Sequence, residues 1–377
     1  MYICIIANGF QVDYTTNLIN SLPRYADKID FIGSDLFPED KINSTINFLN
    51  LRGDQSEDVS VYKKFIRVIK YYRKLFIYGI KYKPDVIHIQ WLRFFVIDGM
   101  LFPILFKMFG HKVFYTAHDV LPHDKDNFIL RITFKLIYKI SNAIVVHTEF
   151  IKSRIVKEFN IKPDKILVVK HGVYQIKENK NIDQSIARNK LKINSKDLII
   201  LFFGRITKYK GLNLLLEAYK QLKKEYPVKL IIAGKPSDSY KKELSNLIEK
   251  YQDGTILFNI GFIEEDDMEI LFKSADVTVL PYFEASQSGV LFMSYAFGIP
   301  VIGPDIGNFP NDIIDGKTGF VFNTGSIESI KEAIIRFHSH WHESNKNARE
   351  YIKEYAKKTY SWDNAGRELV QFYKSKK

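Results

Sequence analysis

The sequence predicts an α/β protein made of two doubly wound parallel sheets in tandem. Short apolar runs alternate with amphipathic segments, a pattern typical of βα units. The alternation stops in a polar stretch near the middle of the chain and then begins again. At 377 residues, of which 46% are hydrophobic, the chain is long enough for two domains with a core each.

The apolar runs are interpreted as strands. In the first half they cover residues 1–7, 84–91, 112–118, 142–148 and 165–172. In the second half they cover residues 198–206, 229–234, 255–261, 276–282, 299–305 and 318–323. We expect the loops at the carboxyl edges of the two sheets to face each other across a cleft.

The predicted domain boundary is the polar segment 175–195, a linker with one short helix. It separates an amino-terminal domain, residues 1–174, from a carboxyl-terminal domain, residues 196–358. The tail has a helical pattern that breaks near residues 359–361, and we expect residues 359–377 to form a helix that crosses back to the first domain. No long repeat recurs, which argues against a solenoid.

The cysteine content and the apolar stretches of the sequence indicate the cellular compartment in which the protein works. The one cysteine, Cys4, lies in an apolar run, so no intrachain disulfide forms and a reducing compartment is indicated. We expect no cleavable signal peptide before the first strand. The longest apolar-rich stretch, residues 94–110, is interrupted by Asp98, Pro103 and Lys107. A cytoplasmic protein without a membrane span is therefore predicted.

The net charge of +12 predicts an anionic partner. Residues 59–83 contain no acid, and their cations are Lys63, Lys64, Arg67, Lys70, Arg73, Lys74, Lys81 and Lys83. Such a segment, rich in Tyr and Phe, resembles an interfacial amphipathic helix and predicts peripheral binding to the inner, anionic face of the cell membrane. Nucleic acid would also accept this surface, but no recognised nucleic-acid module accompanies it. The alternative is an ordinary solvated helix that packs on the sheet, and both interpretations are compatible.

Residues 281–310 form a predicted ligand-binding junction. Glu284 follows a strand that ends at Tyr282, and residues 286–289 open a helix before the next strand. Ligands of open α/β sheets bind outside the carboxyl ends of strands, and a helix N-terminus offers free N–H groups to an anion. A carboxylate beside a phosphate-sized cradle predicts a sugar nucleotide as the ligand.

Two cations follow the strand at residues 198–206. Arg205 can fork across two phosphate oxygens, and Lys210 supplies a point charge. Together they could stabilise a departing diphosphate. Considered alone, they could also be solvated cations in a turn.

The motifs G-R-x4-K-G, E-A-S-Q-S-G-V and A-F-G-I-P-V-I together resemble the carboxyl-terminal domain of retaining GT-B glycosyltransferases, family 4 in particular. The resemblance implies that the first motif, with Gly204, Arg205 and Lys210, binds the donor diphosphate. It implies that Glu284 contacts the donor-sugar hydroxyls. The remaining implied donor-binding residues are Ser288, Gly289 and Val290 near the sugar and phosphates, and Ile263 in a loop that borders the base.

The amino-terminal half resembles the family more weakly, as its acceptor-binding domains usually do. The resemblance implies that residues 1–174 bind the acceptor and that residues 196–358 bind the sugar nucleotide. Residues 116–126 are similar to its T-x-H-[DN]-x-x-P-H segment, which implies that His118 approaches the donor sugar and that His123 shapes the acceptor side. The loop of Asn8, Gly9 and Phe10 is implied to lie near the diphosphate or the acceptor, although it lacks the paired glycines common in the family.

One position departs from the family pattern. The second Glu of the E-x7-E motif, which holds the ribose hydroxyls, is replaced by Phe292. A phenyl ring cannot accept those hydrogen bonds, so ribose recognition must be relaxed, moved or supplied by the backbone. A subset of family 4 sequences with E-A-S-Q-S-G also lacks this acid, and we interpret the change as variation among active enzymes.

Other candidate sites are discarded. The acids at residues 264–267 open a helix, where they favour its dipole. His338, His340 and His342 do not share a helix face. No metal site is therefore predicted, and the absence of a G-x-S-x-G elbow argues against acyl transfer.

The resulting prediction is a retaining GT-B glycosyltransferase that needs neither a metal nor another cofactor. It moves a sugar from a UDP- or GDP-sugar to a glycan acceptor, expected to be polyprenyl-diphosphate-linked, in bacterial surface polysaccharide biosynthesis. Two alternatives stay open: a non-catalytic GT-B partner that binds a sugar nucleotide or an acceptor, and a phosphorylase of the same fold. The sequence does not predict the base, the sugar or the linkage.

Overall fold

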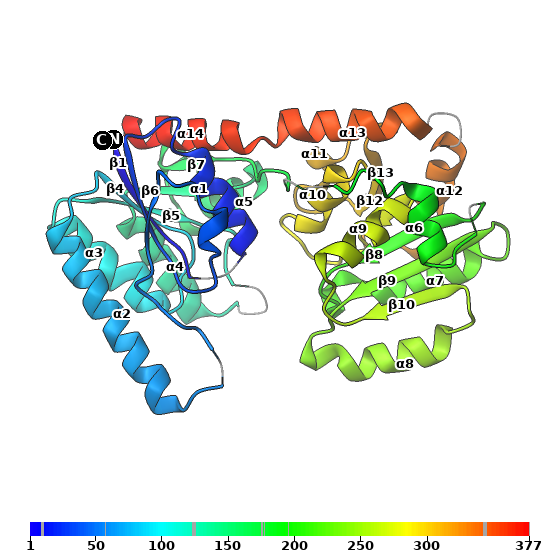
Figure 1. Cartoon of the computed structure of the whole chain (residues 1–377), viewed down its shortest axis with the longest axis horizontal. Helices are drawn as coiled ribbons and strands as arrows, with labels where there is room; N and C mark the ends of the chain where they lie inside the picture. Colours follow the sequence, from blue (N-terminus) through cyan, green and yellow to red (C-terminus); the bar gives the residue numbers. More distant parts are fainter. Residues whose placement is uncertain are drawn as a thin grey trace. The chain divides into compact units, whose positions relative to one another are not determined.

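The computed structural model describes residues 1–8, 11–56, 58–122, 126–174, 176, 178–194, 196–341 and 345–376, with the backbone alone at 341, 345 and 346. The chain divides into two compact units (Figure 1). Unit 1 comprises Met1–Gly172 and Tyr360–Lys377, and unit 2 comprises Val173–Thr359. Unit 1 therefore contains both ends of the chain.

Unit 1 is built on a seven-stranded parallel sheet of order β3-β2-β1-β4-β5-β6-β7. Its strands are β1 (Tyr2–Ile6), β2 (Lys28–Ile32), β3 (Asn47–Leu49), β4 (Val86–Ile89), β5 (Lys112–Thr116), β6 (Ala143–Val146) and β7 (Ile166–Val168). The five predicted strands of this half are present. The order reverses at β1, which lies between β2 and β4.

The sequence prediction missed β2 and β3. In β2 the apolar run is interrupted by Asp30, whose carboxylate is buried and accepts hydrogen bonds from the hydroxyls of Tyr2 and Tyr78 and from the side-chain amide of Asn47. A buried acid with three donors is stable in a strand, but its partners are known only from the fold. β3 is three residues long and gives no periodicity.

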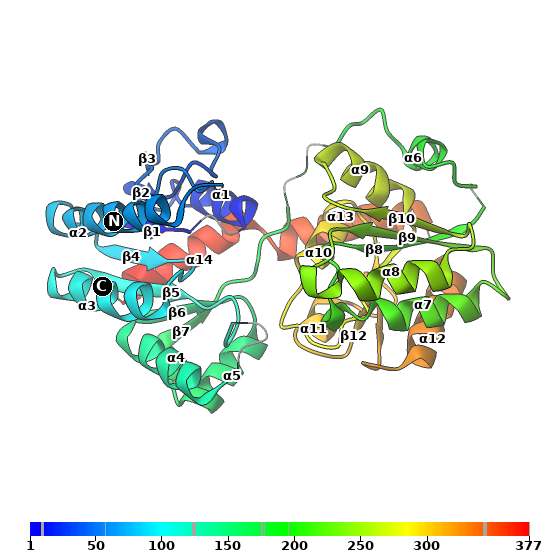
Figure 2. The same cartoon turned by 90° about the horizontal axis from the view of Figure 1, so that it is seen from below.

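Helices cover both faces of the unit 1 sheet (Figure 2). The helices α2 (Val61–Lys81), α3 (Phe102–Met108), α4 (Phe128–Ile140) and α5 (Glu149–Phe159) pack on one face. The helices α1 (Val12–Ser21) and α14 (Trp362–Ser375) pack on the other. Short turns complete the unit: η1 (Glu39–Lys41), the π-helical η2 (Ile97–Leu101) and η3 (Pro163–Lys165).

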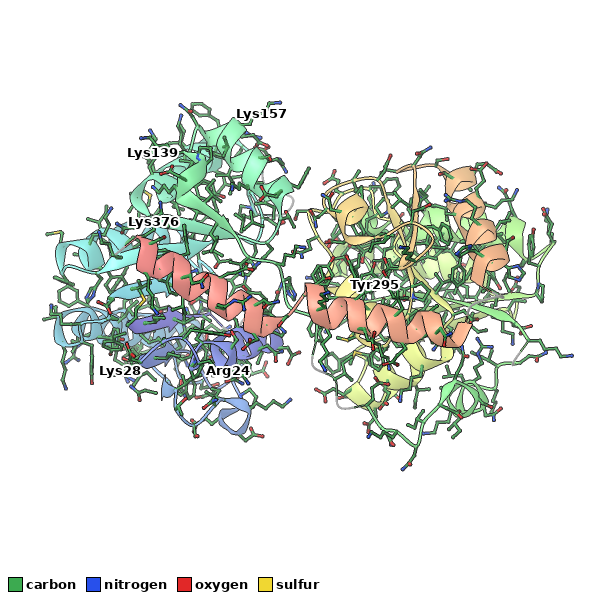
Figure 3. All side chains as sticks on the ribbon, turned by 90° about the horizontal axis from the view of Figure 1, so that it is seen from above. Arg24, Lys28, Lys139, Lys157, Tyr295 and Lys376 are labelled. Carbon is green, nitrogen blue, oxygen red and sulfur yellow. The ribbon has the colours of Figure 1, made fainter. Side chains whose placement is uncertain are left out.

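The last helix, α14, is part of the core of unit 1. Trp362, Leu369 and Tyr373 are buried in the same apolar cluster as β1. At the start of α14, Oδ1 of Asp363 pairs with Nη1 of Arg24, a residue of the loop before β2, at 2.8 Å. Figure 3 labels Arg24 and also Lys376, which follows the end of α14. The helical tail breaks between α13 (Asn345–Thr359) and α14, where the sequence predicted a break.

Unit 2 is built on a six-stranded parallel sheet of order β10-β9-β8-β11-β12-β13. All six predicted strands are present: β8 (Leu198–Phe203), β9 (Val228–Gly234), β10 (Ile256–Ile260), β11 (Val277–Val279), β12 (Val301–Pro304) and β13 (Gly319–Phe322). Its helices, besides α13, are α6 (Gln184–Lys190), α7 (Leu212–Leu222), α8 (Lys241–Tyr251), α9 (Glu265–Ser274), α10 (Gly289–Ala296), α11 (Phe309–Asp312) and α12 (Ile327–Trp341), with the short turns η4 (Lys208–Lys210) and η5 (Asp238–Tyr240). The buried Tyr295 of α10 lies beside α13, with its ring centre 6.3 Å from that of Tyr355 (Figure 3).

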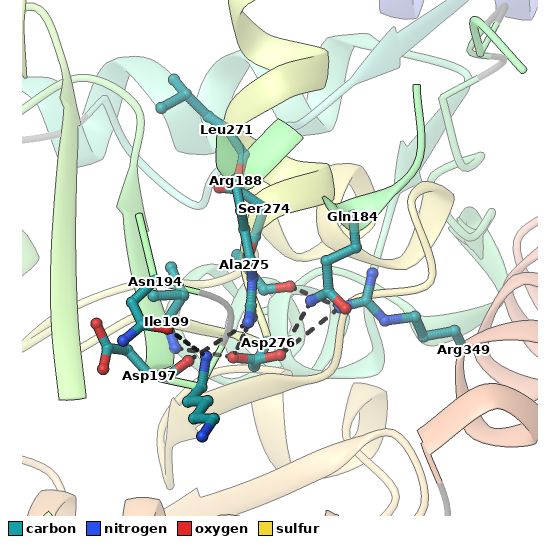
Figure 4. Close-up of polar contacts among 11 residues, drawn as sticks. Gln184, Arg188, Asn194, Asp197, Ile199, Leu271, Ser274, Ala275, Asp276 and Arg349 are labelled. Carbon is teal, nitrogen blue, oxygen red and sulfur yellow. Dashed lines mark hydrogen bonds and ion pairs between the residues drawn. The ribbon is translucent and has the colours of Figure 1, made fainter. Parts of the chain in front are cut away.

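Asp276 ties α6 to the sheet of unit 2 (Figure 4). Its carboxylate accepts hydrogen bonds from Nη2 of Arg188 at 2.6 Å, from Nε2 of Gln184 at 3.0 Å and from the backbone N–H of Ile199 at 2.8 Å. Arg349 of α13 donates to the neighbouring carbonyl oxygen of Ala275 at 2.7 Å. The short helix in the polar segment 175–195 is thus built into unit 2.

Among the described helices, none is long and apolar enough to cross a bilayer.

Candidate functional site

The carboxyl ends of β8 and β11 form the centre of the candidate donor site in unit 2. The strand order reverses at β8, which lies between β9 and β11, and open α/β sheets bind ligands at such a point. β8 is followed by the loop with Arg205 and Lys210, and β11 by the loop with Glu284 and Ser288. The sheet order therefore brings two predicted motifs, far apart in sequence, to one edge.

Gly211 holds these two loops together. Its φ of 65° lies in the left-handed region, and a Cβ atom at this position would lie 1.9 Å from the carbonyl oxygen of Pro281. Only glycine fits so close a contact. In addition, the backbone N–H of Phe283 donates to the carbonyl oxygen of Tyr209 at 2.8 Å. The turn that carries Lys210 is thus fixed against the loop after β11.

Lys210 is the buried cation of this site. Its Nζ lies 5.1 Å from the centre of the Tyr282 ring. A Cβ atom built on Gly204 would lie 3.2 Å from both Nζ of Lys210 and Cγ2 of Val290. The structure therefore brings Gly204, Lys210 and Val290 together. Arg205 follows Gly204 and is exposed.

Ser288 and Gly289 begin α10. Ser288 is buried, and its Oγ lies 3.3 Å from the hydroxyl of Tyr282, the residue whose ring supports Lys210. The first N–H groups of α10 have no acceptor within the helix, as at any helix start, and they provide donors for an anion. A buried cation and the hydroxyl at the start of α10 thus share one aromatic side chain as their support.

Three other positions of the predicted donor site differ from one another in burial and in the element that carries them. Glu284 is exposed on the loop after β11, and the described residues provide no ion pair for it. Ile263 lies on the loop after β10, the edge strand, and packs against the same apolar cluster of unit 2 as Val290. Phe292 is fully buried in α10, so the position of the missing glutamate belongs to the core of unit 2.

In unit 1, His118 lies in a cluster of aromatic rings at the carboxyl ends of the strands. Its ring stacks on Trp91, with centres 4.1 Å apart and planes at 2°. The Tyr14 ring packs edge-on against His118 and His147, at 5.2 and 5.3 Å between ring centres. His171 lies 5.1 Å from Tyr14 and completes the cluster.

Hydrogen bonds determine which nitrogen of His118 carries its proton. Nδ1 of His147 lies 2.9 Å from the carbonyl oxygen of Val169, which can only accept, so this nitrogen is protonated. Nε2 of His147 then accepts from Nδ1 of His118 at 3.1 Å. Nε2 of His118 is buried without a hydrogen bond of ordinary geometry in the described part of the chain, and the backbone of Gln90 lies close enough to the His118 ring to raise its pKa.

Burial keeps this cluster neutral. It lowers the pKa of His171 to about 3, with the nearby His147 as a second cause. The pKa of His118 falls well below its usual 6.5 for the same two reasons, burial first. Burial also lowers the pKa of His147. At neutral pH, Nε2 of His118 is therefore a hydrogen-bond acceptor.

Asn8 follows β1, and its side-chain amide donates to the carbonyl oxygen of Trp91. The predicted residues Gly9, Phe10 and His123 lie outside the described residues, as does His342.

Sequence reasoning missed Trp91 and His147, which orient His118. A signal was present, because histidines stand at or just after the ends of several predicted strands, at His118, His147 and His171. No group of three or more possible metal-ligating side chains occurs within the residues that the structure describes.

Two family models match the chain. The model described as Glycosyltransferase Family 4 matches residues 11–174, and the model described as Glycosyl transferases group 1 matches residues 183–359. The chain belongs to glycosyltransferase family 4. The predicted family and enzyme class are confirmed: the protein is a glycosyltransferase, which transfers a sugar from a nucleotide sugar.

One relative aligns with this family 4 glycosyltransferase over almost its whole length. It is 28% identical over 384 residues to an uncharacterized glycosyltransferase of Methanocaldococcus jannaschii, an alignment that covers 98% of this chain and 95% of the relative.

Solved structures share the fold of this glycosyltransferase. Sucrose-phosphate synthase from Thermosynechococcus elongatus superposes with a TM-score of 0.76 at 17% identity and covers 99% of this chain and 98% of its own. HepE of Anabaena, solved with UDP and glucose, superposes with a TM-score of 0.76 at 15% identity and covers 100% of each chain. The predicted GT-B fold, with its two Rossmann-like parallel sheets, is confirmed.

Proposed function

We propose that this enzyme transfers a sugar from a UDP- or GDP-sugar to a lipid-linked glycan acceptor and retains the anomeric configuration. The observation that carries the proposal is the group of Gly204, Lys210 and Val290 beside the start of α10. The role in bacterial surface polysaccharide biosynthesis is part of the same proposal.

Lys210 binds the donor diphosphate together with Arg205. Because Lys210 is buried, its bond to a phosphate oxygen is less screened by water than a surface contact. The Ser288 hydroxyl and the first N–H groups of α10 supply further donors. Glu284 accepts hydrogen bonds from the sugar hydroxyls. Since Phe292 is buried in the core, the ribose is held by other groups of unit 2.

In the proposed reaction, the bond between C1 of the sugar and the diphosphate oxygen breaks while the acceptor oxygen bonds to C1 on the same face. The acceptor proton passes to the departing phosphate oxygen. Lys210 and Arg205 neutralise the charge that builds on the diphosphate, which lowers the barrier by electrostatic stabilisation. His118 accepts a hydrogen bond at Nε2 from a substrate hydroxyl.

We propose that no divalent metal takes part. Two cations and a helix N-terminus provide positive potential where the diphosphate leaves, the task that a metal ion performs in other transferases.

The membrane part of the proposal rests on the helices of one face of unit 1. Large apolar side chains of α2 are exposed, including Val61 at 83%, Tyr62 at 72% and Phe65 at 61%. Exposed apolar side chains continue on the neighbouring helices at Leu101, Ile104, Met108, Phe128, Ile129 and Ile132. The cations of α2 accompany them, so the surface suits anionic lipid. We call the exposed apolar side chains of α2, η2, α3 and α4, together with the α2 cations, the apolar-basic face.

A transfer assay tests the proposal. The enzyme is incubated with UDP- and GDP-sugars and a polyprenyl-diphosphate-linked glycan, with and without EDTA, and the new linkage is read by NMR. We expect a lipid-linked product with the anomeric configuration of the donor, formed equally in EDTA. An inverted product contradicts retention, and activity restored only by added magnesium or manganese contradicts the metal-free site. Nucleotide binding without turnover on any donor would favour a non-catalytic role.

A further inference from the structure

A second polar pocket, of about 370 Å³, lies entirely in unit 1. It is enclosed by the first half of α2, by residues 52–56 after β3 and by residues 93–94 after β4. Its cationic lining residues are Arg52, Lys64, Arg67 and Arg93. Asp54 is the acid among its lining residues in the described chain. The pocket is distinct from the group of Gly204, Lys210 and Val290, called the Lys210 group below, which belongs to unit 2.

Arg52 is the residue that points to a ligand. It is only 6% exposed, and its guanidinium carbon lies 4.6 Å from the centre of the Tyr71 ring. Its carbonyl oxygen accepts a hydrogen bond from Nε2 of Gln55 at 3.1 Å, which fixes the loop. Yet Nη1 of Arg52 is buried without a hydrogen-bond partner among the described residues. A buried charged donor without an acceptor is costly, and an anionic oxygen in the pocket would satisfy it.

The remaining charges leave the pocket positive. Asp54 pairs with Arg67, which also donates to the carbonyl oxygen of Ser56 at 3.1 Å. Nη1 of Arg93 lies 3.3 Å from Oε1 of Gln55, a neutral acceptor. Among the described residues, no carboxylate pairs with Arg52, Arg93 or Lys64. Within the described part of the chain, these three cations therefore have no acidic partner around the cavity.

Asp98 holds the loop of Arg93 and Phe94, one wall of this pocket, in place. The buried carboxylate accepts from the backbone N–H groups of Arg93 at 2.6 Å and Phe94 at 2.9 Å, and from the hydroxyl of Tyr72 on α2 at 2.7 Å. The loop after β4 and the helix α2 are thus joined through one side chain. Such a preformed wall lowers the cost of binding.

The rim of the pocket is apolar. Leu36 and Phe94 line it and are 51% and 41% exposed. Phe65, 61% exposed, lies on α2 next to the lining residue Lys64. Basic lining residues beside exposed apolar side chains suit a molecule with a charged head and a hydrocarbon tail. A small inorganic ion would need no apolar surroundings.

We infer that this pocket binds the phosphate or diphosphate head of the lipid-linked acceptor. The Arg52 and Arg93 guanidinium groups fork across phosphate oxygens, Lys64 adds a point charge, and Leu36 and Phe94 contact the first carbons of the lipid. The inference rests on the proposed function for the lipid link of the acceptor.

The test is a calorimetric titration of the full chain saturated with UDP, so that the Lys210 group is occupied. The probes are a short polyprenyl diphosphate in neutral detergent micelles, the matching polyprenol in the same micelles, and inorganic pyrophosphate. The variants are Arg52→Gln, Arg52→Lys and the exposed Arg93→Gln. The matched control is Lys157→Gln, an exposed cation of α5 that neither lines the pocket nor belongs to the apolar-basic face.

We expect polyprenyl diphosphate to bind at least tenfold more weakly to Arg52→Gln and Arg93→Gln. Arg52→Lys should bind with intermediate affinity, and Lys157→Gln should bind like the wild type. Equal binding of polyprenol and polyprenyl diphosphate would overturn phosphate recognition. Pyrophosphate bound as tightly as polyprenyl diphosphate would make the pocket a site for a free anion and overturn the assignment to the acceptor. Because Arg93 is exposed, Arg93→Gln keeps the test valid even if the Arg52 variants do not fold.

The titration needs no turnover, which separates this inference from the proposed function. If the lipid diphosphate binds through Arg52 and Arg93 but receives no sugar, the proposed function fails and the pocket stands. If sugar is transferred while both Gln variants bind like the wild type, the pocket fails and the proposed function stands.

Discussion

Lys210 is a buried cation that shares the Tyr282 side chain with Ser288. Replacing it by alanine removes a charge-assisted bond to the diphosphate, a loss of about 1.5–3 kcal/mol. We expect Lys210→Ala to bind UDP correspondingly more weakly in calorimetry, and turnover to fall. Lys208→Ala, which removes an exposed cation from the same turn, is the control. If folded Lys210→Ala bound UDP with wild-type affinity, Lys210 would not be a diphosphate ligand.

Glu284 has a separate predicted role at the same scale. Glu284→Gln keeps the shape of the side chain but removes its charge, and it is exposed, so folding should not change. We predict that transfer from the nucleotide sugar slows while the affinity for the bare nucleoside diphosphate stays the same. Equal loss of both would place Glu284 with the nucleotide rather than with the sugar.

Single residues show where sequence reasoning reached its limit. The motif around Lys210 predicted a cation after β8, but its burial against Tyr282 depends on a loop after β11 that is joined to it by the close approach of Gly211. His118 was predicted from its motif, whereas Trp91 and His147 come from the neighbouring strands β4 and β6. Their contact follows from the sheet order, which residue spacing does not reveal.

At the scale of elements, α2 was predicted closely, because a long basic amphipathic helix has an unmistakable pattern. The structure adds that its cations divide into two sets. Lys64 and Arg67 line the pocket of unit 1, whereas Lys63, Lys70, Arg73, Lys74 and Lys81 are exposed outside it. Strand β2 was missed because Asp30 breaks its apolar run and its hydrogen-bond partners lie on other elements.

This division allows membrane binding to be tested without touching the pocket. Each cation near an anionic surface contributes about 1 kcal/mol, screened by salt. We expect reversal of Lys63, Lys70, Arg73 and Lys74 to Glu to abolish cosedimentation with anionic vesicles at low salt. Transfer to a short water-soluble acceptor should persist and serves as the control for folding. Undiminished cosedimentation of the reversed protein would show that the apolar-basic face does not bind through charge.

At the scale of the whole molecule, buried histidines couple stability to pH. Burial lowers the pKa of His88 and of His171 to about 3, with the neighbouring His147 ring as the second cause for each. In the unfolded chain a histidine has a pKa of about 6.5. Between these values the unfolded state binds more protons, so the free energy of unfolding falls as the pH falls.

The expected size of this effect is measurable. Each of the two histidines lowers the free energy of unfolding by about 1.4 kcal/mol at pH 5.5 relative to pH 8. Urea unfolding at the two pH values, followed by tryptophan fluorescence, measures the difference, since Trp91 and Trp362 lie beside the histidine cluster. A stability that is unchanged or higher at pH 5.5 would mean that the rings take up protons in the folded state.

The position of α14 at the end of the sequence affects the order in which the two units can fold during synthesis. Unit 1 needs Trp362, Leu369 and Tyr373 to cover one face of its sheet, yet these residues follow all of unit 2 in the sequence. While the ribosome is still adding residues 173–359, the first 172 residues have an uncovered apolar surface. Unit 2 can close before unit 1, although it begins later. During synthesis, the uncovered apolar face of the unit 1 sheet must therefore avoid aggregation with other chains until α14 has left the ribosome.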